Sequence, residues 1–187
     1  MSEKPKANRG PSAGPENRRA LIEAAREVFS EFGLAAPLSA VAKRAGVGQG
    51  SLYRHFPNRI SLGVAVFDDN IAHLEALAAR PSSTLSDLFD AVSAQAMNSI
   101  ALIDLLGSDL HDARTQHLAT RFSALVETML ARDHEAHRIA GHVESADIIL
   151  SVSMLALVLS RTDQEQRADV ARRARAIFRG SFSSQPV

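Results

Sequence analysis

Apolar residues recur at helical spacing along most of this 187-residue chain. In the first such segment they fall at i, i+3, i+4, i+7, i+8 and i+11, which places them on one face of a helix. These positions are Leu21, Ala24, Ala25, Val28, Phe29 and Phe32. Gly33 follows, and a glycine is typical of the residue just after a helix. The pattern predicts a first helix over residues 16–32.

The next two predicted helices are short and are separated by a glycine turn. The fixed φ of proline suits the first helical turn, so the second helix is expected to begin near Pro37. Gly46 permits the positive φ that a tight turn over 46–49 needs, and the third helix is expected over 49–56. The inward positions are Leu38, Val41, Ala42 and Ala45 in the second helix, and Leu52 and Phe56 in the third. Two helices joined in this way form a helix-turn-helix, which predicts a three-helix domain over 16–60.

The remainder of the chain keeps the helical pattern. A fourth helix is expected over 59–79. Further helices are predicted over 84–106, 114–137, 144–159 and 164–179. No long stretch alternates with a period of two, and no NG or DG dipeptide marks a hairpin. We therefore expect an all-α fold with eight or nine helices, in which residues 61–187 form a second domain.

Charge is distributed unevenly between the two predicted domains. The chain has 21 Lys and Arg against 21 Asp and Glu, for a net charge of zero. Residues 1–60 hold ten cations against five glutamates, about +5, so residues 61–187 carry about −5. No acidic residue occurs between Glu31 and Asp68. A polyanion would be attracted to the N-terminal third, as expected of a protein that binds nucleic acid through one domain.

Composition excludes several other classes of protein. The chain has no cysteine, which rules out disulfides, a thiolate nucleophile and a Cys-ligated zinc site. Its start lacks an apolar run, so a secretory signal is not expected. The longest strongly apolar stretch covers 148–159, whereas a membrane span needs roughly 20 residues. We expect a cytoplasmic protein without a membrane partner.

Residues 1–15 are rich in Pro, Gly, Ala, Ser and Lys. Such a composition buries too little apolar surface to offset the entropy of ordering, so we expect a flexible basic arm. A second interpretation is that Lys4, Lys6 and Arg9 contact phosphates or the minor groove of DNA.

The most informative stretch is AGVGQGSLYRHF, over residues 45–56. It belongs to a longer series of spaced motifs: F-x-x-x-G at 29–33, A-x-x-A-G-V at 42–47, G-x-L-Y-x-H-F at 50–56 and N-R-x-x-L at 58–62. Over residues 18–67 the chain resembles the N-terminal domain of the TetR family of transcriptional regulators. The resemblance implies a non-enzymatic DNA-binding regulator without a cofactor, usually a repressor that a small molecule releases from its operator. It also implies that residues 61–187 serve ligand binding and dimerisation.

The resemblance assigns roles to the side chains around the third helix. By this resemblance, Gln49 and Ser51 are expected to contact bases, and Arg54 suits contact with either bases or phosphates. Phosphate contact is expected of Lys43, Tyr53, His55 and Arg59. Gly48 stands where the family commonly has Ser or Thr before this helix, and Pro37 stands where many members place Thr or Ser. Glycine is a tolerated N-cap, so the helix is expected to form, but a hydroxyl contact to phosphate from either position is lost. The competing interpretation makes Tyr53 a packing residue and His55 an ordinary surface residue.

The predicted helix over 144–159 is apolar around nearly its full circumference. A surface helix needs one apolar stripe, so this helix must be buried on two sides. It is either the central helix of a monomer core or, as the family resemblance implies, part of a homodimer in which the last two helices pair with their twofold mates. Alanines at 168, 171, 174 and 176 would allow close approach in such a bundle. A twofold dimer predicts a palindromic operator on double-stranded DNA.

The family resemblance also implies a small-molecule effector inside the second domain. The candidate contacts are Phe89, Met97, Leu102, Phe122, Met129 and Met154. Their apolar character favours a largely apolar ligand. The alternative is that they are ordinary core residues.

Two other functions compete with this interpretation. The first is a metal-dependent enzyme or metal sensor, which would use histidines and carboxylates from two segments. One segment holds Asp133, His134, Glu135, His137 and His142. The other holds Asp109, His111 and Asp112. The zincin motif places its histidines at i and i+4, whereas His134 and His137 lie at i and i+3, so a solvated polar surface is the simpler explanation. An interaction protein that has lost DNA binding is disfavoured by intact Tyr53, His55 and Arg59.

Overall fold

The computed structural model describes residues 14–32, 36–95 and 113–183. Its complete helices are α1 (Gly14–Phe32), α2 (Leu38–Arg44), α3 (Gln49–His55), α4 (Arg59–Ala78), α6 (Ala113–Glu135), α7 (Ser145–Ser160) and α8 (Arg167–Phe182). A further helical stretch covers 85–95. The described ranges hold no strand beyond a single bridge between Ile139 and Ser183, so the all-α prediction is confirmed.

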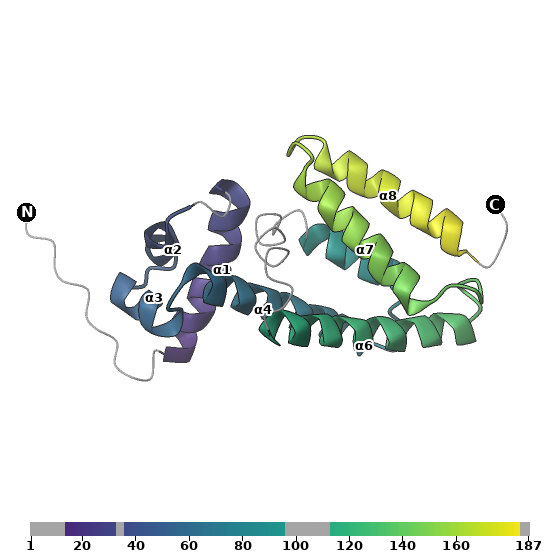
Figure 1. The fold of residues 1–187 in the computed structure, drawn as a ribbon, viewed down its shortest axis with the longest axis horizontal. Coiled ribbons are helices and arrows are strands. Elements are labelled where there is room, and N and C mark those ends of the chain that lie inside the picture. The colour runs from purple at the N-terminus through teal and green to yellow at the C-terminus, as the bar shows by residue number, and fades with distance from the viewer. Residues whose placement is uncertain (1–13, 33–35, 96–112, 184–187) are drawn as a thin grey trace, which may run out of the picture.

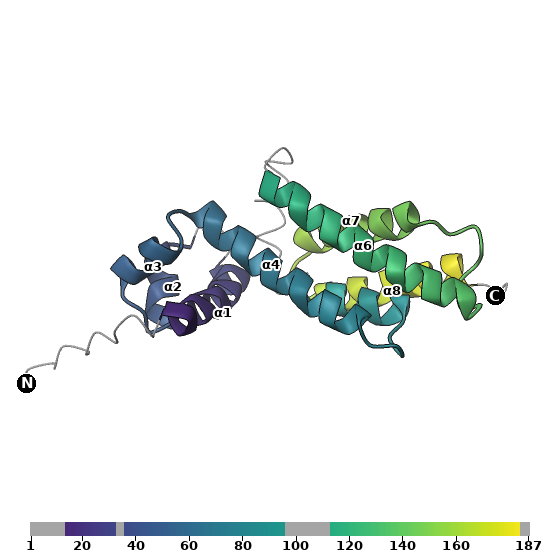
Figure 2. The same cartoon turned by 90° about the horizontal axis from the view of Figure 1, so that it is seen from below.

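The helices form two groups joined by one long helix (Figure 1). Helices α1, α2 and α3 lie together at one end, which we call the head. Helices α6, α7 and α8 lie at the other end with the stretch over 85–95, and we call this group the body. Figure 2 shows α4 running from the head into the body, where it lies beside α6. The expected boundary after residue 60 falls in the first turn of α4.

The head is built around the apolar face that the sequence predicts. Leu21, Val28 and Phe29 of α1 are buried, and Leu52 and Phe56 pack into the same cluster. Phe32 differs, because it lies at the last position of α1 with 58% of its surface exposed. The other members of this cluster are Ile22, Ala24, Ala25, Ala36, Leu38, Val41, Ala42, Leu62, Ala65 and Val66.

The turn between α2 and α3 has the expected geometry at its glycine. Gly46 has φ of +65°, a conformation that favours glycine because a side chain is strained there. The amide of Val47 donates to the carbonyl of Ala42 at 3.0 Å, which closes the turn against α2. Pro37 corrects one expectation: its φ of −67° and ψ of 141° make it the extended N-cap of α2 and not the first helical residue.

Helix α4 begins at a capping box that the sequence analysis did not identify. The Oδ1 atom of Asn58 accepts from the amide of Ser61 at 2.8 Å, and the Ser61 hydroxyl accepts from the amide of Asn58 at 3.3 Å. These bonds satisfy two backbone donors that a helix start otherwise leaves without partners. They fix the point at which the chain leaves the head.

The body encloses a second apolar cluster. Its buried residues come from α4, the stretch over 85–95, α6 and α7, and include Leu74, Leu88 and Met129. Helices α6 and α7 match their predicted positions closely, whereas α8 begins at Arg167 and ends at Phe182, about one turn later than expected. None of the described helices is long and apolar enough to cross a membrane.

Two arginines, one from the head and one from the body, pair with α4. From α1, Arg26 donates to the carboxylate of Asp69 at 2.6 Å and to the side chain of Asn70 at 3.2 Å. From α6, Arg121 donates to both oxygens of Glu75 at 2.8 and 2.7 Å and also pairs with Asp68. Hydrogen bonds from Arg121 lower the pKa of the Glu75 carboxyl. Helix α4 is therefore tied to the head and to the body by charged contacts as well as by packing.

Candidate nucleic-acid interface

Helix α3 is held to the head by one face and presents the other to solvent. Leu52 and Phe56 are buried in the head cluster. On the outer side, Gln49, Tyr53 and Arg54 are exposed. Ser51 and His55 are half-buried, and Gly48 is the extended N-cap. The six predicted positions from Gly48 to His55 thus include a continuous exposed surface, and 51% of the Tyr53 surface is open to solvent.

Two neighbouring cations at the end of α2 have different surroundings. Arg44 donates to Glu27 and to Glu31 of α1, both at 2.9 Å. The hydrogen bonds that Arg44 donates to Glu31 and, to a smaller extent, to Glu27 raise the pKa of its guanidinium. Lys43 is exposed, and no ion pair joins it to any of the residues that the structure describes. Of the two, Lys43 is the one available to an external phosphate.

Arg59 lies differently from the expected phosphate contact. Its Nη1 donates to the backbone carbonyl of Ala36 at 2.7 Å, and its guanidinium carbon lies 5.9 Å from the centroid of the Phe29 ring. These contacts join the first turn of α4 to α1 and to the start of α2. The structure therefore gives Arg59 a role inside the head, and a phosphate could meet only its remaining N–H groups.

Two further cations lie near α3. The Nε of Arg54 donates to the carbonyl of Gly50 at 3.2 Å, which lays this side chain along its own helix. Arg18 of α1 lies over the Phe56 ring, with its guanidinium carbon 5.4 Å from the ring centroid. Arg18 could not be assigned to the site from the sequence, because its proximity to Phe56 depends on how α1 crosses α3.

Gly50 is also absent from the predicted set. A Cβ built at this position meets no atom within 4 Å, so packing inside the protein does not require glycine. Glycine in a helix costs about 1 kcal/mol relative to alanine. The position is on the exposed side of α3, where the missing side chain lets another molecule approach the backbone closely.

Of the predicted effector contacts, the structure describes four, and these differ in their burial and position. Phe89 and Met129 are buried and Phe122 is half-buried, whereas Met154 is 53% exposed on α7. Met97 and Leu102 lie outside the described residues. A cavity of about 260 Å³ lies among three elements: the start of the helical stretch over 85–95, the end of α6, and α8. Among the predicted contacts that the structure describes, Phe89 lines this cavity. Helical spacing alone does not distinguish which side of α7 faces the body.

Two residues of the metal alternative, Asp133 and His134, have other partners. Both carboxylate oxygens of buried Asp133 are engaged, one by Arg138 at 2.9 and 2.7 Å and the other by the amide of Leu85 at 2.9 Å. The Nε2 of His134 lies 3.2 Å from the carbonyl of Ala140. Within the described ranges no group of three or more His, Asp or Glu side chains could hold a metal ion. Asp109, His111 and Asp112 lie outside those ranges.

The surroundings of Arg59 generate a prediction that separates packing from DNA contact. We expect Arg59→Met to lower the free energy of unfolding by about 1 kcal/mol, because the Ala36 carbonyl loses a charged donor. Urea denaturation followed by circular dichroism measures this change. Arg54→Met is the matched control, since it removes an exposed contact within one helix and should leave stability within about 0.5 kcal/mol. Equal stability of the two variants would contradict the structural role of Arg59.

Comparison with known proteins agrees with the geometry of the head. Residues 21–66 match the model for bacterial regulatory proteins of the TetR family. No curated protein sequence matches the chain significantly.

Solved structures extend the similarity beyond the head. A TetR transcriptional regulator of Streptomyces coelicolor, SCO0520, is 25% identical, with 89% of this chain and 98% of that chain covered and a TM-score of 0.65. A TetR transcription regulatory protein of Mycobacterium vanbaalenii is also 25% identical, with coverage of 92% and 98% and a TM-score of 0.70. The reduced form of Escherichia coli NemR shares the fold at 20% identity, with coverage of 91% and 100% and a TM-score of 0.62. The head therefore matches the DNA-binding domain of the TetR family, and most of the chain has the fold of TetR-family transcriptional regulators.

Proposed function

We propose that the protein is a homodimeric repressor that binds a palindromic operator through α3 and leaves it when a small, largely apolar ligand binds the body. The observation that carries this proposal is the outward surface of α3. Leu52 and Phe56 fix the helix to the head, while Gln49 and Tyr53 project into solvent. The absence of acidic residues between Glu31 and Asp68 keeps carboxylates out of this segment.

The exposed positions divide by their place on the helix. Gln49 and Ser51 lie in the first turn of α3, the part of a recognition helix that reaches base edges in the major groove. Tyr53, His55 and Lys43 lie around it and carry groups that bind phosphate oxygens. Arg54 suits either contact, and Gly48 and Gly50 let the backbone approach the DNA. Arg59 supports this surface from inside the head and adds to the positive potential.

Salt dependence tests the phosphate contact from Lys43. Each phosphate that a protein neutralises adds about 0.9 to the slope of log K against log salt concentration. We expect Lys43→Met to reduce that slope by about one unit at every DNA sequence, measured by fluorescence anisotropy over a salt series. Arg172→Met removes another exposed cation, on α8, and should leave the slope unchanged. Identical slopes for the Lys43→Met variant and the unmodified protein would contradict the assignment of Lys43 as a phosphate contact.

The apolar outer side of α7 supports pairing with a second copy. Ile148, Leu155 and Leu159 are buried within the chain. On the opposite side, Leu150, Met154 and Val158 are 59%, 53% and 50% exposed at i, i+4 and i+8. Exposed apolar surface of this kind marks protein interfaces. A twofold pair through α7 and α8 would hold two α3 helices about 34 Å apart, as a palindromic operator requires.

The dimer can be tested without DNA. We expect Met154→Glu to yield a monomer, because pairing would bury a carboxylate against apolar surface. Light scattering coupled to size-exclusion chromatography measures the mass. Phe32→Glu is the matched control, since Phe32 is 58% exposed at the end of α1 in the head and should leave the dimer intact. A dimeric Met154→Glu variant, or a monomeric unmodified protein, would rule out pairing through this side of α7.

Helix α4 supports the release step. It packs in both clusters and pairs with Arg26 of the head and Arg121 of the body. A ligand that changes the packing of the body therefore acts on the helix that carries the head. Coupling of about 1 to 3 kcal/mol between the two sites is enough to shift DNA affinity by 5- to 150-fold.

A further inference from the structure

The cavity at the far end of the body, away from the head, has an aromatic wall. The rings of Phe89 and Phe178 stack with their centroids 5.2 Å apart, and Phe182 lies 6.4 and 6.2 Å from these two. Three phenyl groups from two elements therefore offer ring faces and edges to the same space. A planar apolar group is the ligand chemistry that fits them.

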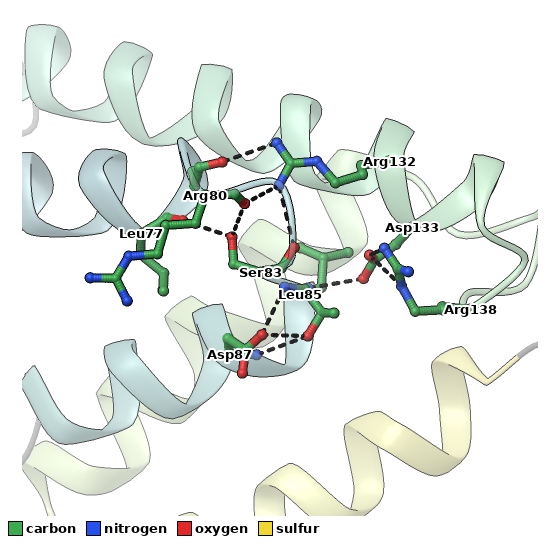
Figure 3. Close-up of polar contacts among 10 residues, drawn as sticks. Leu77, Arg80, Ser83, Leu85, Asp87, Arg132, Asp133 and Arg138 are labelled. Carbon is green, nitrogen blue, oxygen red and sulfur yellow. Dashed lines mark hydrogen bonds and ion pairs between the residues drawn. The ribbon is translucent and has the colours of Figure 1, made fainter.

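The acidic group in the lining is already neutralised. Asp133 is 2% exposed, and Figure 3 shows it between the backbone of Leu85 and the side chain of Arg138. Its two oxygens accept three hydrogen bonds from these neighbours. A cationic ligand would have to displace those donors from a buried carboxylate, which is costly. The cavity therefore does not favour a cation.

Arg179 is the cation of the lining that Asp133 does not neutralise, because Asp133 pairs with Arg138. The cavity lining includes Arg138 and Arg179 against the single carboxylate of Asp133. The Nε and Nη2 of Arg179 donate to the Ser86 hydroxyl at 3.2 and 2.8 Å, and the Asp90 carboxylate lies 3.9 Å away. A hydroxyl is a neutral acceptor, so an anionic ligand group would gain a stronger, charge-assisted bond from this guanidinium.

The walls of the cavity are held in place. The amide of Ala140 donates to the carbonyl of Phe182 at 2.9 Å, which fixes the end of α8 to the loop after α6. Arg132 of α6 donates to the carbonyls of Arg80 and Ser83 at 2.8 and 3.3 Å and to that of Ala78 at 3.0 Å (Figure 3). Arg132 directly precedes Asp133 of the lining, and Ala78 is the last residue of α4, so a residue next to the lining contacts the end of the helix that reaches the head.

We propose that this cavity binds a small aromatic carboxylate, with the ring against Phe89, Phe178 and Phe182 and the carboxylate on Arg179. A cavity of about 150 Å³ holds benzene, so about 260 Å³ accommodates one ring with a short acidic chain. The inference deepens the proposed function, since it rests on there being an effector and names the chemical class and position of that effector.

Three probes that share a phenylpropyl skeleton test the charge preference. Isothermal titration calorimetry of the full-length protein with 3-phenylpropionate, 3-phenylpropanol and 3-phenylpropylamine compares an anion, a neutral group and a cation. We expect the carboxylate to bind about tenfold more tightly than the alcohol and the amine to bind most weakly. No binding of the carboxylate, or equal affinity for carboxylate and amine, would overturn the proposal.

A variant pair then locates the charge. Arg179→Met should lower the affinity for 3-phenylpropionate by about tenfold while leaving that for 3-phenylpropanol unchanged. Arg172→Met, on an exposed position of the same helix, should change neither affinity. Circular dichroism verifies that both variants fold. Equal effects of the two substitutions on the carboxylate would contradict the assigned site.

A measurement of DNA binding separates this inference from the proposed function. The affinity of the protein for a duplex recovered by its own selection is measured with and without 3-phenylpropionate. Weaker DNA binding supports both the site and the release step. Specific binding of the carboxylate with unchanged DNA affinity supports the site and contradicts release through it, whereas failure of DNA binding in the absence of any probe contradicts the proposed function alone.

Discussion

The structure depends on one helix being part of two cores. The first half of α4 contributes Leu62 and Val66 to the head cluster, and its second half contributes Ile71 and Leu74 to the body cluster. Phe67, between them, packs against both. Because close-packed cores resist small deformations, α4 cannot tilt in the body without carrying the head with it. The position of α3 is thereby set in part by the packing of helices at the other end of the molecule.

Charged contacts also hold α4 to the head and to the body. Arg26 and Arg121 hold neighbouring stretches of α4 from the head and the body, and Arg132 holds the carbonyl of its last residue. The arginines thus contact α4 in its middle and at its C-terminal end. The carboxylates that face Arg26 and Arg121 belong to the segment where the acidic part of the chain begins, at Asp68. The switch from basic to acidic composition accordingly coincides with the point where α4 leaves the head.

The sequence was sufficient to predict features that depend on local spacing. The buried face of α1, the positive φ of Gly46 and the inward positions Leu52 and Phe56 all follow from periodicity and glycine chemistry. It was insufficient where a contact joins distant positions. Arg59 meets a carbonyl 23 residues earlier, and Arg44 meets acids 17 and 13 residues earlier, so neither partner could be inferred from spacing. The cavity brings Phe89 beside Phe178 and Phe182, a pairing that depends on where α8 crosses the body.

The central claim is that the outward surface of α3 reads DNA as one half of a twofold pair. Selection of bound sequences from a random duplex pool tests it most directly, because the enriched sequences report binding, symmetry and spacing together. The account predicts an inverted repeat whose half-sites are centred about one helical turn, or a multiple of it, apart. Enrichment of a single asymmetric site, or of no sequence at all, would contradict it.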